Sequence, residues 1–89
     1  MFYLRCKYAR SRFLGEYSVQ ILAGERERYL VDVNDLEPID RKEGLVRVVA
    51  LASSGNMALV GINDVGKGKQ FNFYVPQDDL IDDLKAIRK

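Results

Sequence analysis

The sequence lacks histidine and tryptophan altogether and has a single cysteine, Cys6, among its 89 residues. Without histidine, the chain has neither the commonest general acid–base group nor the base of Ser–His and Cys–His nucleophile pairs. The usual zinc ligands are missing too, and one cysteine cannot replace them. An internal disulfide is excluded, as is typical of proteins from a reducing compartment. We therefore expect a protein that is not an enzyme and that holds no metal and no cofactor.

Long apolar stretches are also absent. No run approaches the roughly 20 apolar residues of a membrane-spanning helix, so we expect no contact with a membrane. Residues 1–8 mix apolar side chains with Arg5 and Lys7, unlike the apolar core of a signal peptide. We accordingly expect a cytoplasmic protein.

What the chain does contain predicts one small β-domain spanning residues 1–89. Hydrophobic residues make up 47% of the sequence, and its tyrosines and phenylalanines supply bulky core material. Apolar residues recur at every second position in several short segments, which is the pattern of half-buried strands. In the first segment, Phe2, Leu4, Cys6 and Tyr8 form the inward set. The predicted strands cover residues 2–8, 16–23, 26–33, 45–52, 57–62 and 70–75.

Two segments, residues 29–36 and 73–80, resemble each other. Each runs from aromatic and apolar residues into a polar turn that closes on Asp-Leu, with Val31 and Val75 at matching places. This echo predicts two similar β-units, about 1–40 and 44–89, each of which ends in a short helical turn. In the first unit we place that turn at about residues 35–39.

The last residues have a helical pattern. Pro76 ends strand pairing, and Asp78 and Asp79 suit the positive end of a helix dipole. Apolar residues follow at helical spacing, at positions 80, 81, 84 and 87. Together with the strands, this pattern predicts a six-stranded antiparallel barrel, SH3-like or related, with a short C-terminal helix. The Tyr-Val-Pro sequence at 74–76, just before the helical stretch, is similar to the end of SH3-type domains.

Two further patterns point to ion binding but fit other roles better. Residues 61–68 nearly match the phosphate-binding loop GxxxxGK[ST], but Gly68 lacks the hydroxyl that holds magnesium, and a strand rather than a helix follows. We expect a hairpin turn at this place. The carboxylates at positions 78, 79, 82 and 83 lack the alternating spacing and the central glycine of a calcium loop. We attribute them to solubility and to the helix N-terminus.

The net charge of +1 hides an uneven distribution along the chain. Residues 1–15 carry four basic side chains and no acid, whereas residues 16–40 carry seven acids against two arginines. Basic groups neutralise phosphates, and exposed aromatic rings stack on bases. The candidate nucleic-acid patch comprises Tyr3, Arg5, Lys7, Arg10, Arg12, Phe13, Lys67, Lys69 and Tyr74. The alternative is a solvated face whose arginines pair with acids of the second and third predicted strands.

The fourth and fifth predicted strands have apolar residues on both faces, including Leu45, Val49, Leu51 and Leu59. A domain this small has few elements to cover them, and an exposed apolar patch marks an interface. We therefore predict a non-catalytic binding or regulatory module that acts through protein–protein contacts, as an adaptor, a subunit or a homo-oligomer. Binding of nucleic acid through the basic and aromatic patch is the alternative function.

Overall fold

The structure is a computed structural model that describes residues 1–22 and 27–82 of the chain. Within these residues it contains strands and short 3₁₀ turns but no α-helix. The strands are β1 (Phe2–Arg10), β2 (Glu16–Ile21), β3 (Arg28–Asp32), β4 (Leu36–Pro38), β5 (Glu43–Ser54), β6 (Met57–Asp64) and β7 (Lys69–Pro76). The 3₁₀ turns are η1 (Val33–Asp35) and η2 (Gln77–Asp79). The prediction of a mainly β protein is confirmed.

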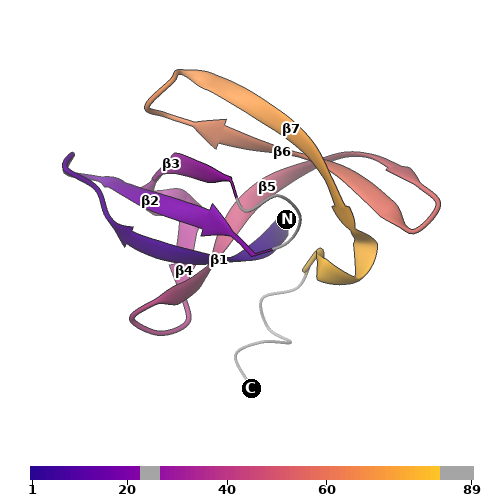
Figure 1. Cartoon of the computed structure of the whole chain (residues 1–89), viewed down its shortest axis with the longest axis horizontal. Coiled ribbons are helices and arrows are strands. Elements are labelled where there is room, and N and C mark those ends of the chain that lie inside the picture. Colours follow the sequence, from indigo (N-terminus) through magenta and orange to yellow (C-terminus); the bar gives the residue numbers. More distant parts are fainter. Residues whose placement is uncertain (23–26, 83–89) are drawn as a thin grey trace.

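The strands form one curled antiparallel sheet with the order β3-β2-β1-β5-β6-β7, and the short β4 also pairs with β5 (Figure 1). The predicted barrel is only half formed, because no ladder joins the edge strands β3 and β7 within the described chain. The two ends of the sheet meet instead at the β6–β7 turn, where the Val65 amide donates to the Leu30 carbonyl oxygen at 2.9 Å.

The core is built from alternate residues of the strands, as the sequence pattern predicts. On β1, Leu4 and Cys6 are fully buried, whereas Arg5 and Lys7 are exposed. The same alternation on the neighbouring strands completes a cluster of buried residues around the concave side of the sheet. This core comprises Leu4, Cys6, Val19, Ile21, Tyr29, Val31, Leu36, Val46, Val48, Ala58, Val60, Ile62 and Val75.

The two segments that resemble each other in sequence also fold alike. Each is the end of a strand, β3 or β7, followed by a 3₁₀ turn and a leucine. The leucine N–H bonds back to the first residue of the turn, from Leu36 to Val33 and from Leu80 to Gln77. The helical turn expected at the end of each of the two similar segments is therefore present.

Beyond these turns, the chain returns to the two central strands of the sheet. β4 pairs with β5, and Ile81 forms an isolated antiparallel bridge with Tyr3 of β1. In this bridge, the Tyr3 amide donates to the Ile81 carbonyl at 2.7 Å, and the Ile81 amide donates to the Tyr3 carbonyl at 2.9 Å. The end of each half of the chain therefore pairs with the first strand of the other half: β4 with β5, and Ile81 with β1.

The described residues do not contain the expected C-terminal helix. After η2, Leu80 is extended (φ −85°, ψ 123°) and Ile81 pairs with β1. A short helix is marginal on its own, whereas here Leu80 packs against the core and Ile81 uses the backbone of β1 that β2 leaves unpaired. Leu84 and Ile87 of the expected helix lie outside the described residues, as do the strand ends expected at residues 23 and 26.

The helical turn expected at residues 35–39 lies earlier, at η1. The Asp32 side chain accepts a hydrogen bond from the Asn34 amide at 2.8 Å, which caps the turn at residue 32. The chain is then extended again from Leu36, and it forms β4, a strand that the sequence pattern did not predict.

Candidate functional site

The nine side chains predicted to form one binding patch lie at three separate places. These places are the outer face of β1 (Tyr3, Arg5, Lys7), the end of β1 with the loop after it (Arg10, Arg12, Phe13), and the β6–β7 hairpin (Lys67, Lys69, Tyr74). The outer face is the side of the sheet that points away from the core. The structure therefore offers several smaller surfaces in place of one continuous patch.

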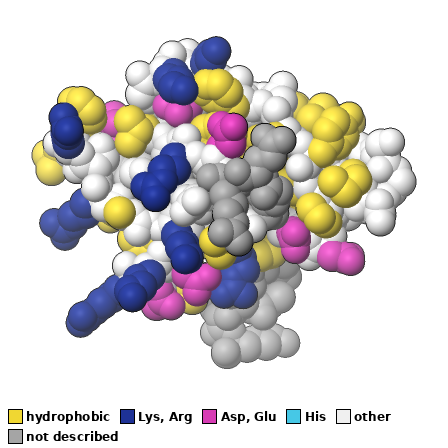
Figure 2. Space-filling model, in the orientation of Figure 1, with side chains coloured by type: hydrophobic (Ala, Val, Ile, Leu, Met, Phe, Trp, Pro, Cys, Tyr) yellow, Lys and Arg dark blue, Asp and Glu magenta, His cyan; other side chains and the backbone are white. Residues whose placement is uncertain are grey.

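Strand pairing gathers basic side chains of β1, β3 and β5 on the outer face of the sheet. Lys7 lies opposite Gln20, and Gln20 lies opposite Arg28 on the next strand. On the other side of β1, Tyr3 lies opposite Arg47 of β5. We call the set Tyr3, Arg5, Lys7, Arg28 and Arg47 the basic face. In Figure 2, Lys and Arg side chains are spread over the left part of the molecule.

Two members of the basic face, Arg28 and Arg47, were missing from the sequence prediction. Each directly precedes a buried residue of its strand, Tyr29 or Val48, so the alternation already marks it as outward-facing. The strand register decides which outward-facing residues are neighbours, and the register cannot be read from the sequence.

Acidic groups neutralise part of the basic face. Arg5 forms an ion pair with Glu43 at 3.9 Å, which is a weak contact because both side chains are partly exposed. Asp78 and Asp79 line a hollow of about 190 Å³ together with Arg5. The solvated-face alternative expected acids from the second and third strands; the ones found come from β5 and η2.

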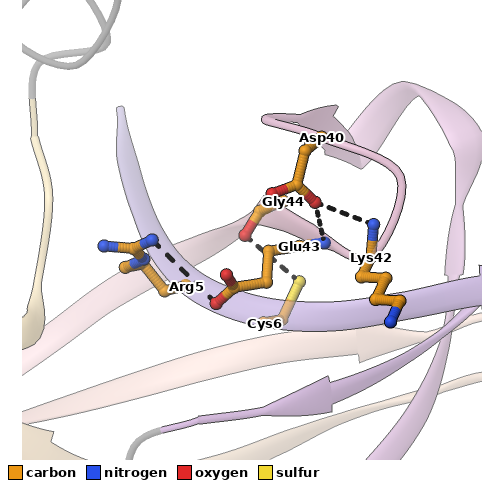
Figure 3. A network of polar contacts seen from close by, with 6 residues as sticks. All are labelled: Arg5, Cys6, Asp40, Lys42, Glu43 and Gly44. Atoms are coloured by element: carbon orange, nitrogen blue, oxygen red, sulfur yellow. Dashed lines mark hydrogen bonds and ion pairs between the residues drawn. The ribbon is translucent and has the colours of Figure 1, made fainter.

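A polar network holds Glu43 beside Arg5 (Figure 3). One carboxylate oxygen of Asp40 accepts hydrogen bonds from the Glu43 and Lys42 amides, each at 2.8 Å. These two amides, Glu43 first, lower the pKa of the Asp40 carboxyl. The Tyr8 hydroxyl donates to the Asp40 carbonyl oxygen, which ties the loop to β1. The network shapes the β4–β5 loop and provides no reactive group.

The two lysines of the hairpin turn lie against β7 rather than over β1. The Lys67 and Lys69 ammonium groups are 5.2 and 4.7 Å from the centre of the Phe71 ring, which is within cation–π distance. Lys67 also lines a hollow of about 240 Å³ with Arg28 and Ser18, so the turn adjoins one edge of the basic face.

Residues 61–68 form the end of β6 and a tight turn, as predicted, and not a phosphate cradle. The backbone amides that such a cradle would offer to an anion are already bonded within the protein. Val65 N donates to Leu30 O, Lys67 N to an Asp64 carboxylate oxygen at 3.0 Å, and Gly68 N to the Asp64 carbonyl at 2.9 Å. The Asp64 side chain is buried and also accepts a long 3.4 Å bond from the Leu30 amide.

The β1–β2 loop presents exposed side chains at one end of the sheet. Phe13 is 61% exposed and Leu14 is fully exposed. The loop is shaped by a bond from the Phe13 amide to the Ser11 hydroxyl oxygen at 3.1 Å and by Gly15, whose φ of +84° suits glycine. Arg10 and Arg12 line the same hollow as Phe13, so these predicted residues form a small group of their own.

A second surface is apolar and covers the outer face of β5, β6 and β7. Val49 is 53% exposed and Tyr74 is 54% exposed, and half-buried Leu59 lies directly opposite Tyr74. Val49 is on the same face, because it lies opposite Gly61, which follows Leu59 at a spacing of two on β6. We call Val49, Leu59 and Tyr74 the apolar face. Figure 2 shows hydrophobic side chains gathered at the right, over these three strands.

The other apolar residues named from the sequence have different surroundings. Leu45 is buried, although it lies opposite Arg5 on the outer side of the sheet. Leu51 is 43% exposed at a register shift of β5 and lines a groove of about 470 Å³ with Phe2 and Leu80. Apolar residues on both faces of β5 are thus confirmed, but only Val49 is on the apolar face.

The cysteine is poorly suited to chemistry. Cys6 is fully buried, and burial raises the pKa of its thiol from 9.0 to about 12. The thiol donates to the Gly44 carbonyl at 3.6 Å. No group of three or more His, Cys, Asp or Glu side chains suited to a metal ion occurs in residues 1–22 and 27–82.

Comparisons with known proteins found no matching family model, no similar curated protein and no similar solved structure. The similarity to SH3-like barrels stays a prediction. No helix in the described part of the chain is long and apolar enough to cross a membrane.

Proposed function

We propose that this protein is a non-catalytic binding module of the cytoplasm that acts through protein–protein contacts at the apolar face. The observation that carries the proposal is the exposure of Val49 and Tyr74 on the outer face of β5 and β7, with Leu59 on β6 between them. Contiguous exposed apolar groups are costly in water unless a partner covers them. Tyrosine is, in addition, one of the residues most enriched at the energetic centres of interfaces.

Affinity capture with surface variants tests the proposal. We expect Val49→Lys/Tyr74→Lys to lose proteins that the wild type retains from an extract of the source cells, because two desolvated apolar contacts are replaced by charges. Ile39→Lys is the matched control, since Ile39 is 43% exposed in the β4–β5 loop, away from the apolar face. Circular dichroism of all three proteins checks that the fold is intact. Identical sets of retained proteins for the wild type and both variants would contradict the proposal.

The basic face supports nucleic-acid binding as a second candidate function. The observation in its favour is that strand register adds Arg28 and Arg47 to Tyr3, Arg5 and Lys7 on one side of the sheet. The neighbouring carboxylates of Glu43, Asp78 and Asp79 weaken it, because they repel phosphate. We therefore rank it behind protein binding.

Fluorescence anisotropy of labelled single- and double-stranded DNA and RNA tests this second candidate at low and near-physiological salt. If the basic face binds phosphates, affinity falls steeply with salt, and Lys7→Glu/Arg28→Glu weakens binding about tenfold or more. The comparison variant is Arg10→Glu/Arg12→Glu, which makes the same change of net charge at the β1–β2 loop, away from the basic face. Loss in the loop variant alone would move the site to the β1–β2 loop. Absence of binding at low salt would exclude this function.

A further inference from the structure

The outer edge of β7 is open along its length. Within the described residues, β7 pairs only with β6, and Figure 1 shows it along the upper outline of the molecule. The Gln77 amide donates to the Asn56 carbonyl at 2.9 Å, so Gln77 and every second residue before it on β7 form the bonded pairs with β6. Because bonded and non-bonded pairs alternate in an antiparallel ladder, Gln70, Asn72 and Tyr74 direct their backbone groups away from β6.

The side chains of β7 suit a further strand at this edge. Phe71 and Phe73 point to the core side, where both rings contact Tyr29, but they remain half-buried, so a neighbouring strand would cover more of their surface. On the other side of β7, Tyr74 belongs to the apolar face. The backbone of Pro76 also points away from β6. Pro76 cannot donate a hydrogen bond, but it lies near the end of the edge, where the missing N–H costs least.

The two ends of this edge carry opposite charges. Lys67 and Lys69 lie at its beginning, and Asp78 and Asp79 lie just beyond its end in η2; all four side chains are exposed. Lys67 and Lys69 lie over the Phe71 ring, and Asp78 and Asp79 line a hollow with Arg5. None of the four forms an ion pair among residues 1–22 and 27–82, where the ion pair found joins Arg5 and Glu43. An antiparallel copy of the same edge would bring each lysine end against an aspartate end. The edge is therefore complementary to itself.

We infer that β7 pairs antiparallel with β7 of a second copy of the chain, across a two-fold axis at Phe73. In this register, Tyr74 of one copy lies opposite Asn72 of the other, and the outward backbone groups of both strands bond to each other. The Phe73 rings of the two copies meet on the core side, and the Lys67–Lys69 end of each copy faces Asp78 and Asp79 of the other. The inference rests on the proposed function: it names one protein partner, a second copy, which contacts the β7 edge beside the apolar face.

A single shared strand edge buries less area than the roughly 1,200 Å² at which stable interfaces begin. The dimer is therefore a reversible one, in equilibrium with the monomer. Its charged ends make the equilibrium sensitive to salt, because exposed charge pairs are screened.

Charge exchange between copies tests the two-fold arrangement by sedimentation equilibrium of the full chain. Lys67→Glu/Lys69→Glu alone and Asp78→Lys/Asp79→Lys alone each place like charges at both ends of the interface. We expect each variant to raise the dimer Kd about tenfold or more relative to wild type. An equal mixture of the two variants restores opposite charges at both ends, and we expect it to form a mixed dimer with a Kd within about threefold of wild type. A mixture no more associated than its components would overturn the antiparallel arrangement.

A backbone variant tests the strand edge itself. Asn72→Pro removes one outward N–H while leaving the bonds between β6 and β7, so we expect a monomer with an intact fold. Asn72→Ala is the matched control. It keeps the N–H and loses the same side-chain contact, the bond that Gln70 Nε2 donates to Asn72 Oδ1 at 2.9 Å. Equal association of the two variants would overturn pairing through β7.

Wild-type protein that stays monomeric at every concentration would overturn the second copy as the occupant. That result is distinguishable from failure of the proposed function, which the capture experiment with Val49→Lys/Tyr74→Lys measures on foreign proteins. Loss of capture by Asn72→Pro, in a monomeric wild type, would assign the β7 edge to a strand of another protein.

Discussion

At the scale of single residues, burial decides which side chains are available for chemistry or binding. Cys6 is a nucleophile by type, but it lies in the core beside Leu4 with its thiol bonded to Gly44. Its raised pKa keeps the thiol protonated at neutral pH, and only the thiolate is a good nucleophile. The exposed residues that can meet a partner, such as Val49 and Tyr74, have no reactive group.

The Cys6 thiol predicts a pH dependence of stability. Below about pH 9 the thiol is protonated in the folded and unfolded chains alike. Between pH 9.0 and about 12 the unfolded chain loses this proton whereas the folded chain keeps it, so the free energy of unfolding falls as pH rises. The contribution is at most about 1.4 kcal/mol per pH unit.

Urea unfolding of wild type and Cys6→Ala at a series of pH values between 8 and 11, flanking the unperturbed pKa of 9.0, measures this effect. Both proteins contain the same tyrosines and lysines, so the comparison isolates the effect of the thiol. We expect wild type to lose stability more steeply with pH than Cys6→Ala. Parallel curves would mean that the buried thiol does not resist ionisation.

At the scale of elements, Asp64 connects parts of the sheet that are far apart in sequence. Its side chain is 3% exposed and accepts bonds from the Lys67 amide in the β6–β7 turn and from the Leu30 amide at the edge of β3. With the bond from Val65 to Leu30, it joins the two ends of the half-barrel. Its role is structural, and the turn that it shapes carries the lysines of the β7 edge.

We expect Asp64→Asn to lower the free energy of unfolding by about 1–3 kcal/mol, because an amide cannot replace a buried carboxylate that accepts bonds on both oxygens. Urea denaturation measures the change. Asp79→Asn is the control, since Asp79 is exposed in η2, and it should alter stability by less than about 0.5 kcal/mol. Equal effects of the two substitutions would contradict this account of Asp64.

The elements also show how far the sequence alone leads. Alternation located the strands, since burying every second residue is a local requirement. The echo predicted a turn at the end of each segment, although η1 lies earlier than the expected residues 35–39. The pairings of β4 with β5 and of Ile81 with Tyr3 are contacts between distant segments, and three-residue or single-residue pairings leave no periodic pattern. The helical spacing of residues 80 and 81 was overridden by such a pairing.

At the scale of the whole molecule, the sheet separates two kinds of surface. The basic face lies over β1, β2, β3 and part of β5, and the apolar face lies over β5, β6 and β7 (Figures 1 and 2). The sequence supplied the members of the candidate patch but not their grouping, because Lys7 and Arg28 become neighbours only through β2. Lys67 and Lys69 lie on the β6–β7 hairpin, at the start of the β7 edge, where Lys67 adjoins the basic face.

We propose that the β5–β7 part of the sheet, with its open β7 edge, binds protein, and that a second copy is a partner. Amide NMR spectra of the full chain across a dilution series test it most directly. We expect concentration-dependent shifts and slowed amide exchange at Gln70, Asn72 and Tyr74, with smaller changes at Val49 and Leu59 and none at Gln20 and Arg28. Spectra that do not change with concentration, or changes confined to the basic face, would contradict the claim.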